Sequence, residues 1–97
     1  MNHKKLTDQQ LLKKAGHLQL GLDEAGKYRH FLCERPVPAG SSLRLWREGS
    51  WIWARYEWDF RLEHLPLLYL ADGETAVTVA RATEKSLLRW PEDWEQL

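Results

Sequence analysis

The sequence predicts a mainly β protein, a small antiparallel barrel or roll of about six strands with a short N-terminal helix. Three observations support this fold class. Apolar and polar residues alternate with a period of two over several short stretches between residues 17 and 81. Turn signals that contain glycine separate these stretches. The hydrophobic fraction is 43%, which is enough for a packed interior.

We expect a single domain over residues 1–97, with an N-terminal helical segment (1–16), an antiparallel β region (17–81) and a C-terminal tail with a short helical turn (82–97). No apolar run approaches the length of a membrane-spanning helix, so no membrane contact is expected. The basic N-terminus is not followed by the apolar region of a secretory signal. A single cysteine excludes an internal disulfide, and a cytoplasmic location is therefore expected.

The first predicted element is a helix over residues 7–15. Thr7 and Gln10 have the spacing of a capping box, in which each side chain binds the backbone N–H of the other residue. The period then changes to two, and residues 17–33 are predicted to form a hairpin. The prolines within residues 35–41 exclude a central strand in that segment.

Four further strands are predicted, over residues 43–47, 51–58, 67–71 and 74–81. The segments Glu48-Gly49-Ser50 and Asp72-Gly73 are hairpin signals between them. The near-continuous apolarity of residues 67–71 predicts burial on both faces of that strand. Pro91 is followed by acidic residues, which predicts a helical turn near the C-terminus.

The hairpin over residues 43–58 carries the predicted binding surface. Cross-strand matching of like side chains places Trp46 opposite Trp51 and Leu45 opposite Ile52, and alternation then sorts the hairpin into two sets. The expected core face consists of Leu43, Leu45, Ile52, Ala54, Tyr56 and Trp58. The other set, which we call the Trp/Arg face, consists of Arg44, Trp46, Trp51, Trp53, Arg55 and Glu57.

Two interpretations of the Trp/Arg face are open. In the first, another layer of the domain covers the tryptophans, while Arg44 and Arg55 extend to the rim. In the second, the face is partly exposed and binds a partner. An uncovered face with three tryptophans would exceed the apolar patch that a lone soluble domain normally shows. The second interpretation predicts a non-enzymatic interaction module.

The expected partner of this face is a protein. This expectation includes a second copy of the chain, in a homodimer formed through an edge strand. The alternative is single-stranded DNA or RNA, because indole rings and guanidinium groups together can stack on bases. Four N-terminal lysines would assist that binding: Lys4, Lys5, Lys13 and Lys14. However, 14 basic and 14 acidic residues give a net charge of zero, which argues against a strong nucleic-acid binder.

No catalytic residue, metal site or other cofactor is expected. The chain has four histidines, His3, His17, His30 and His64, and their spacing is not that of a zinc site. Cys33 together with His30 or His64 would be a nucleophilic pair, but a lone cysteine in an apolar strand is more often a small core residue. The acidic residues Glu57, Asp59 and Glu63 are interpreted as part of a charged surface loop.

A family resemblance covers about residues 35–81. It is carried by the segments Ala39-Gly40-Ser41-Ser42-Leu43-Arg44-Leu45, Gly49-Ser50-Trp51, Arg55-Tyr56-Glu57 and Leu68-Tyr69-Leu70. Together they resemble the G-x-W…R-x-E pattern of a bacterial family of small β-rich proteins, a domain of unknown function. Ser41 stands where that pattern prefers Asp. Members are typical of bacterial, plasmid and phage genomes. The resemblance therefore implies a mobile-element accessory protein, such as an inhibitor that docks on a host or defence complex.

Overall fold

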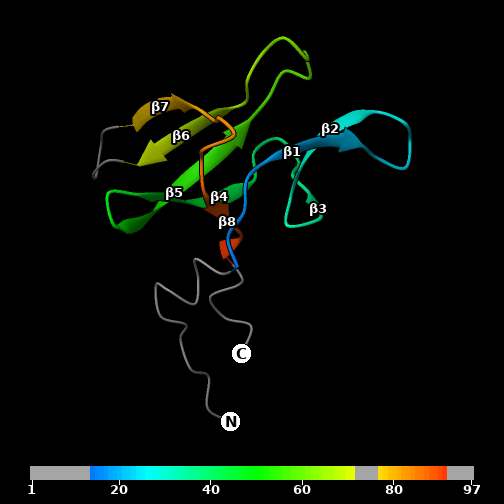
Figure 1. Ribbon diagram of the computed structural model, residues 1–97. Coiled ribbons are helices and arrows are strands. Elements are labelled where there is room, and N and C mark those ends of the chain that lie inside the picture. Colours follow the sequence, from blue (N-terminus) through cyan, green and yellow to red (C-terminus); the bar gives the residue numbers. More distant parts are fainter. Residues whose placement is uncertain (1–13, 72–76, 92–97) are drawn as a thin grey trace.

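A computed structural model describes residues 14–71 and 77–91 of the chain, which form two antiparallel sheets (Figure 1). The strands are β1 (Gln19–Leu22), β2 (Tyr28–Leu32), β3 (Arg35–Pro36), β4 (Ser42–Arg47), β5 (Ser50–Glu57), β6 (Leu67–Ala71), β7 (Val77–Arg81) and β8 (Leu88–Arg89). The larger sheet has the order β7-β6-β5-β4-β8, and the smaller sheet has the order β1-β2-β3. Strands that are neighbours in sequence pair with each other, except that β8 returns to pair with β4.

The mainly β class and the predicted strands are confirmed. β1 and β2 form the hairpin predicted over residues 17–33, and β4 to β7 match the four later predicted strands. β3 and β8, with two residues each, are additional to the prediction. Most of the predicted helix over residues 7–15 and the predicted C-terminal turn lie outside the described residues, and the described Lys14 and Ala15 are not helical.

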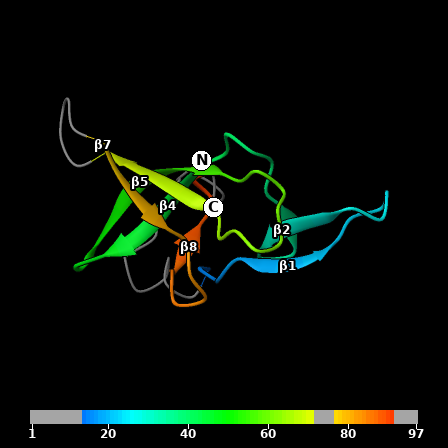
Figure 2. The ribbon, with the colours of Figure 1, turned by 90° about the horizontal axis from the view of Figure 1, so that it is seen from above.

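Of the two predicted forms, a barrel or a roll, the barrel is wrong, because the strands divide between two sheets that do not close. The smaller sheet ends at Pro36, and Pro38 follows two residues later. Val37 N still donates to His30 O, so the N–H groups that Pro36 and Pro38 lack would have lain on the outer edge of β3. No further strand is paired there, and the chain begins the second sheet at β4. Figures 1 and 2 show the smaller sheet beside the larger one, on the side away from β7.

The β4–β5 hairpin has the predicted register. Arg47 pairs with Ser50, so the connecting turn contains only Glu48 and Gly49. Their φ angles are 52° and 83°, and two positive φ angles are what a type I′ turn requires. This turn places Trp46 opposite Trp51, and it places Leu45 opposite Ile52. The separation of the hairpin into two faces is therefore confirmed.

One side of the larger sheet supplies most of the core. Its buried residues are Leu43, Leu45, Ala54, Tyr56, Leu68, Leu70 and Leu88. Leu32 from β2, Val37 and Trp90 pack in the same cluster. β6 corrects the prediction of burial on both faces, because Leu67 and Tyr69 on the opposite side of this strand are only half-buried.

Two polar contacts join the sheets through this core. His30 Nδ1 of β2 lies 2.7 Å from the Tyr56 hydroxyl of β5, and Trp90 Nε1 donates a hydrogen bond of 2.9 Å to Leu32 O. The His30 ring also meets the Trp58 ring edge to face, at 4.4 Å between centroids. Burial lowers the pKa of His30 and raises the pKa of Tyr56. Both shifts favour the neutral forms that can share this hydrogen bond.

Cys33 and Glu34 form the two-residue turn between β2 and β3. Their φ angles are 51° and 68°, although neither is glycine. Cys33 is exposed in this turn, with its Sγ 3.4 Å from Lys14 O. The interpretation of Cys33 as a small core residue is therefore wrong, because the pairing of Leu32 with Arg35 places it at the tip of a hairpin.

This turn generates a stability prediction. We expect Glu34→Gly to raise the free energy of unfolding by about 0.5–1 kcal/mol, since a residue with a Cβ pays an energetic cost at positive φ that glycine avoids. Glu84→Gly is the matched control, because Glu84 is also an exposed turn residue but has no positive φ. It should lower the free energy of unfolding. Urea unfolding of both variants measures the difference, and a loss of stability in Glu34→Gly would contradict the turn assignment.

The buried histidine generates a pH prediction. We expect the free energy of unfolding to fall as the pH decreases below 6.5, the ordinary pKa of histidine. The unfolded chain binds a proton there, whereas His30 in the folded chain stays neutral until its lower pKa is reached. Asp23 and Asp59, whose pKa values are lowered from 3.8, contribute only at more acidic pH.

Urea unfolding over this pH range measures the effect. His30→Gln removes the titrating group but retains a hydrogen-bond partner for Tyr56. This variant should lose the pH dependence near 6.5. An equal pH dependence in the variant and the wild type would show that another group is responsible.

Candidate binding surface

The Trp/Arg face forms part of one side of the five-stranded sheet. Cross-strand pairing extends it beyond the six residues predicted from the hairpin, because residues that pair directly share a side of the sheet. Three rows cross the face: Arg89–Arg44–Trp53, Arg55–Tyr69–Val79 and Glu57–Leu67–Arg81. We use the name Trp/Arg face from here on for the six residues together with these additions, namely Leu67, Tyr69, Val79, Arg81 and Arg89.

These additions could not be found from the hairpin alone. Alternation within residues 67–71 and 77–81 indicates which residues share a side of each strand. It does not indicate which of these sets lies on the same side of the sheet as the tryptophans of β5. The pairing of β8 with β4 has no signal in the sequence, since Leu88 and Arg89 are joined to the rest of the sheet by only two register positions. Arg89 is therefore the member of the face that sequence reasoning had least means to identify.

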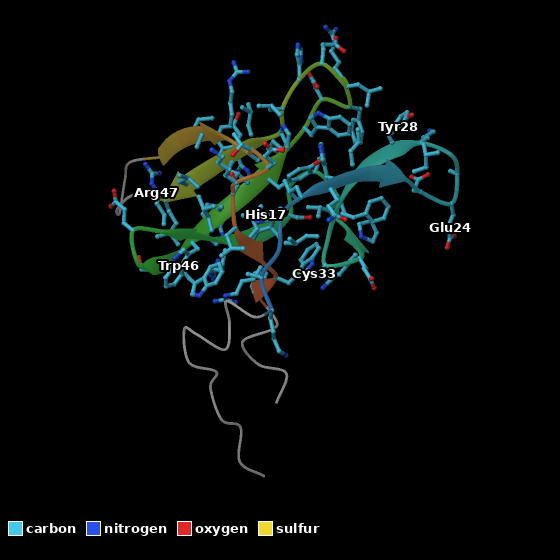
Figure 3. All side chains as sticks on the ribbon, in the orientation of Figure 1. His17, Glu24, Tyr28, Cys33, Trp46 and Arg47 are labelled. Atoms are coloured by element: carbon cyan, nitrogen blue, oxygen red, sulfur yellow. The ribbon has the colours of Figure 1, made fainter. Side chains whose placement is uncertain are left out.

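The face is partly exposed. Trp53 has 36% of its surface accessible and Val79 has 49%, while Trp46 and Trp51 are half-buried. The buried residues of the larger sheet's hydrophobic cluster lie on the opposite side. Figure 3 shows Trp46 and its neighbour Arg47 on opposite sides of β4. Of the two interpretations of this face, the exposures favour partial exposure over complete coverage.

Arginine and aromatic side chains stack on one another across the face. The Trp46 and Trp51 rings meet edge to face, with 5.1 Å between centroids and an interplanar angle of 63°. Arg89 Cζ lies 4.9 Å from the Trp51 ring centroid, and Arg55 Cζ lies 4.9 Å from the Tyr69 ring centroid. A guanidinium group over a ring is stabilising and still directs its N–H groups sideways. The rings thus hold the arginines in defined positions.

Arg44 lies on β4, next to the edge strand β8, and has unused hydrogen-bonding capacity. It pairs with Arg89 on one side and with Trp53 on the other. Its one hydrogen bond in the described chain is a long one, 3.4 Å from Nη1 to Leu43 O, and no described carboxylate lies within ion-pair distance of it. A guanidinium group has five N–H donors, so most of the Arg44 donors have no acceptor among the described residues.

The charge of the face differs from the charge of the chain. The face carries four arginines and one glutamate. Arg44, Arg55 and Arg81 are at least partly accessible, whereas Arg89 is only 3% exposed and is packed within the face. The glutamate, Glu57, is 3.5 Å from Arg55 in an exposed ion pair. Because the chain has 14 basic and 14 acidic residues, ten basic and thirteen acidic residues lie elsewhere. An exposed ion pair contributes little energy. The face is therefore a positive region on a neutral protein.

Trp51 adds a polar group that lacks a hydrogen bond. Its Nε1 atom is buried, and no acceptor in the described part of the chain contacts it. A buried donor without an acceptor costs about 1–3 kcal/mol. The ring is nevertheless held there between Trp46 and Arg89. The contacts of the Trp51 ring with Trp46 and Arg89 are thus formed despite the energetic cost of an unsatisfied indole N–H.

The other reactive side chains are committed to structural contacts. His30 is bonded to Tyr56, and His64 Nδ1 lies 2.6 Å from Asp59 Oδ2, a hydrogen bond that lowers the pKa of Asp59. Neither histidine is bonded to Cys33, so the geometry of a nucleophilic pair is not formed. Within residues 14–71 and 77–91, no three metal-ligating side chains form a cluster.

A second exposed apolar cluster was not predicted. Its members are drawn from the exposed apolar residues of the β1–β2 hairpin (Leu20, Leu22 and Tyr28) and of the loop after β5 (Phe60, Leu62 and Leu65), and three of these six lie together. Leu20, Leu62 and Leu65 line a groove of about 240 Å³ together with His30 and Trp58. The alternation of Leu20 and Leu22 in the sequence was visible, but the proximity of the loop was not, because the loop appeared only as charged and irregular.

Comparison with other proteins adds no family assignment. No protein-family model matches the chain, and no similar protein was found among the curated proteins or the solved structures. The family resemblance over residues 35–81 stays a prediction. The described residues contain no helix with the length and apolarity needed to cross a membrane.

The two sides of the sheet should respond differently to truncation. We expect Leu70→Ala, on the core side, to lower the free energy of unfolding by about 2–5 kcal/mol, because it leaves a cavity at a fully buried position. Trp53→Ala, on the exposed side, should cost less than half as much despite the larger side chain. Thermal or urea unfolding of the pair measures this. Equal losses would show that Trp53 belongs to a second core.

Proposed function

We propose that this chain is a non-catalytic binding module whose Trp/Arg face holds an acidic segment of a protein partner. The observation that carries the proposal is the position of Arg44. Arg44 pairs with Arg89 and Trp53 on the neighbouring strands, and most of its donors are unused. The accessible part of the face has three arginines, Arg44, Arg55 and Arg81, and one glutamate. Carboxylates accept two parallel hydrogen bonds from such a group, and these are among the strongest in proteins.

The stacking within the face favours a protein over a nucleic acid. One surface of the Trp51 ring and one surface of the Tyr69 ring already face guanidinium groups, so a base would have to displace an arginine to stack there. The chain as a whole is neutral, and nucleic-acid affinity depends on excess positive charge. A carboxylate needs no free ring surface, because it binds the N–H edge of the guanidinium.

The dimensions of the face favour a segment over a broad interface. Five strands spaced about 4.8 Å apart and about five residues long give a surface of about 20 by 17 Å. This is less than half of the about 800 Å² that each partner buries in a standard protein interface. One extended segment or loop of the partner fits this area, with an apolar side chain on Trp53 and carboxylates on Arg44 and Arg55.

The proposal includes a cytoplasmic role. The single cysteine, Cys33, is exposed and forms no disulfide, as is usual in reducing compartments. The family resemblance further suggests an accessory protein of a phage or plasmid, with the acidic segment supplied by a host or defence complex.

The arginines of the face generate a binding prediction. We expect Arg44→Gln and Arg55→Gln each to weaken the affinity for an acidic peptide about 5- to 30-fold, because each removes a charge-assisted hydrogen-bond donor. Arg47→Gln is the matched control, since Arg47 lies on the same hairpin and projects from the other side (Figure 3). Isothermal titration calorimetry measures all three. Equal weakening by Arg47→Gln would indicate general charge attraction.

The choice of partner class is tested with two defined probes. One is a synthetic peptide in which Glu and Asp alternate with Leu and Phe, and the other is an oligothymidine of similar length. Backbone amide shifts are recorded by NMR during titration with each probe, at low and at physiological salt. Peptide-induced shifts confined to the Trp/Arg face at physiological salt support the proposal. Tighter oligonucleotide binding that falls steeply with salt would assign the face to single-stranded nucleic acid instead.

A further inference from the structure

β7 forms an open edge of the larger sheet. The strand order ends at β7, whereas the other edge strand, β8, has a backbone bridge between Leu88 and Gly16 with two hydrogen bonds of 2.8 Å. β7 lies on the side of the larger sheet away from the smaller sheet (Figures 1 and 2). An edge strand presents a row of unpaired N–H and C=O groups and readily pairs with another strand.

The hydrogen-bond pattern shows which residues of β7 direct their backbone groups outward. Ala82 N donates to Pro66 O, its directly opposite residue, so Ala80 and Thr78 also bond to β6. In an antiparallel strand, the intervening residues direct their N–H and C=O groups to the other side. Val77, Val79 and Arg81 therefore present their backbone groups at the open edge.

We propose that β7 pairs antiparallel with β7 of a second copy of this chain, with the two-fold axis at Val79. This is the two-fold symmetric register in which all three outward-facing residues form hydrogen-bonded pairs. Val79 pairs with Val79 of the second copy, and Val77 pairs with Arg81 in both directions. About six backbone hydrogen bonds form, because each of these pairs exchanges two. Proline, lysine and bulges commonly protect edges, but β7 contains none of them.

The charges of the strand are compatible with this pairing. Arg81 of one copy lies opposite an uncharged residue, and the two Arg81 residues are separated by about four residues along the strands, or about 13 Å. That distance exceeds the Debye length of about 8 Å at physiological salt, so their repulsion is largely screened. The two Trp/Arg faces lie on the same side of the resulting ten-stranded sheet, since the two-fold axis is perpendicular to the plane of the sheet.

The test is the mass of the full-length protein in solution and the pattern of its amide exchange. Sedimentation equilibrium of the wild type should give twice the chain mass of 11.5 kDa. Val79→Lys should raise the dimer dissociation constant at least about tenfold. Val79→Pro should do the same by removing an outward N–H while leaving the bonds to β6 intact. Val79→Thr is the control and should remain dimeric, because threonine is equally suited to a strand.

Hydrogen exchange identifies the edge that pairs. In the dimer the amides of Val77, Val79 and Arg81 should be protected, and in Val79→Lys they should exchange rapidly while those of Thr78 and Ala80 stay protected. If Val79→Pro unfolds, as circular dichroism would reveal, Val79→Lys alone carries the test. A wild type that is monomeric at high concentration would overturn the proposal. So would a dimer that survives Val79→Lys, since it must form through another surface.

Discussion

The register of the β4–β5 hairpin is the constraint on which the rest of the structure depends. The two-residue turn at Glu48 and Gly49 fixes it, because positive φ at both positions sets the twist at which the strands pair. A slip of one residue would move every side chain of one strand to the opposite face. Tryptophan and arginine would then replace leucine in the core. The positive surface and the hydrophobic cluster are two consequences of a single turn.

The division into two sheets determines how this hairpin is used. Pro36 and Pro38 lack N–H groups on the outer edge of β3, which disfavours pairing of a further strand with the smaller sheet. The strands β1 to β3 pack against the core side of the larger sheet, where the His30–Tyr56 and Trp90–Leu32 hydrogen bonds join the sheets. The side that carries the arginines has no such layer among the described residues. Its partial exposure follows from the packing of the smaller sheet on the opposite side.

The sequence was informative where local rules decide the structure. Alternation and the turn residues were sufficient to predict the hairpins and the Trp46–Trp51 pairing. Arrangements that depend on distant contacts could not be predicted from it. The pairing of β8 with β4, the separation into two sheets and the groove beside Leu20 all require knowledge of which strands meet. The location of Cys33 also depends on strand pairing. Its apolar neighbours indicated a strand, but the pairing of Leu32 with Arg35 places Cys33 in a turn.

The face and the edge are related through their geometry, although each proposal stands without the other. Val79 belongs to both, because its side chain lies on the Trp/Arg face while its backbone groups lie at the edge. Pairing at this edge would set two positive faces side by side on a sheet about 45 Å wide. A segment too weakly held by one face of about 20 by 17 Å could then span two, and binding at the second face would be intramolecular. If the proposed function holds, a neutral chain would gain selectivity in this way, because arginines gathered on one surface attract acidic segments without a general affinity for polyanions.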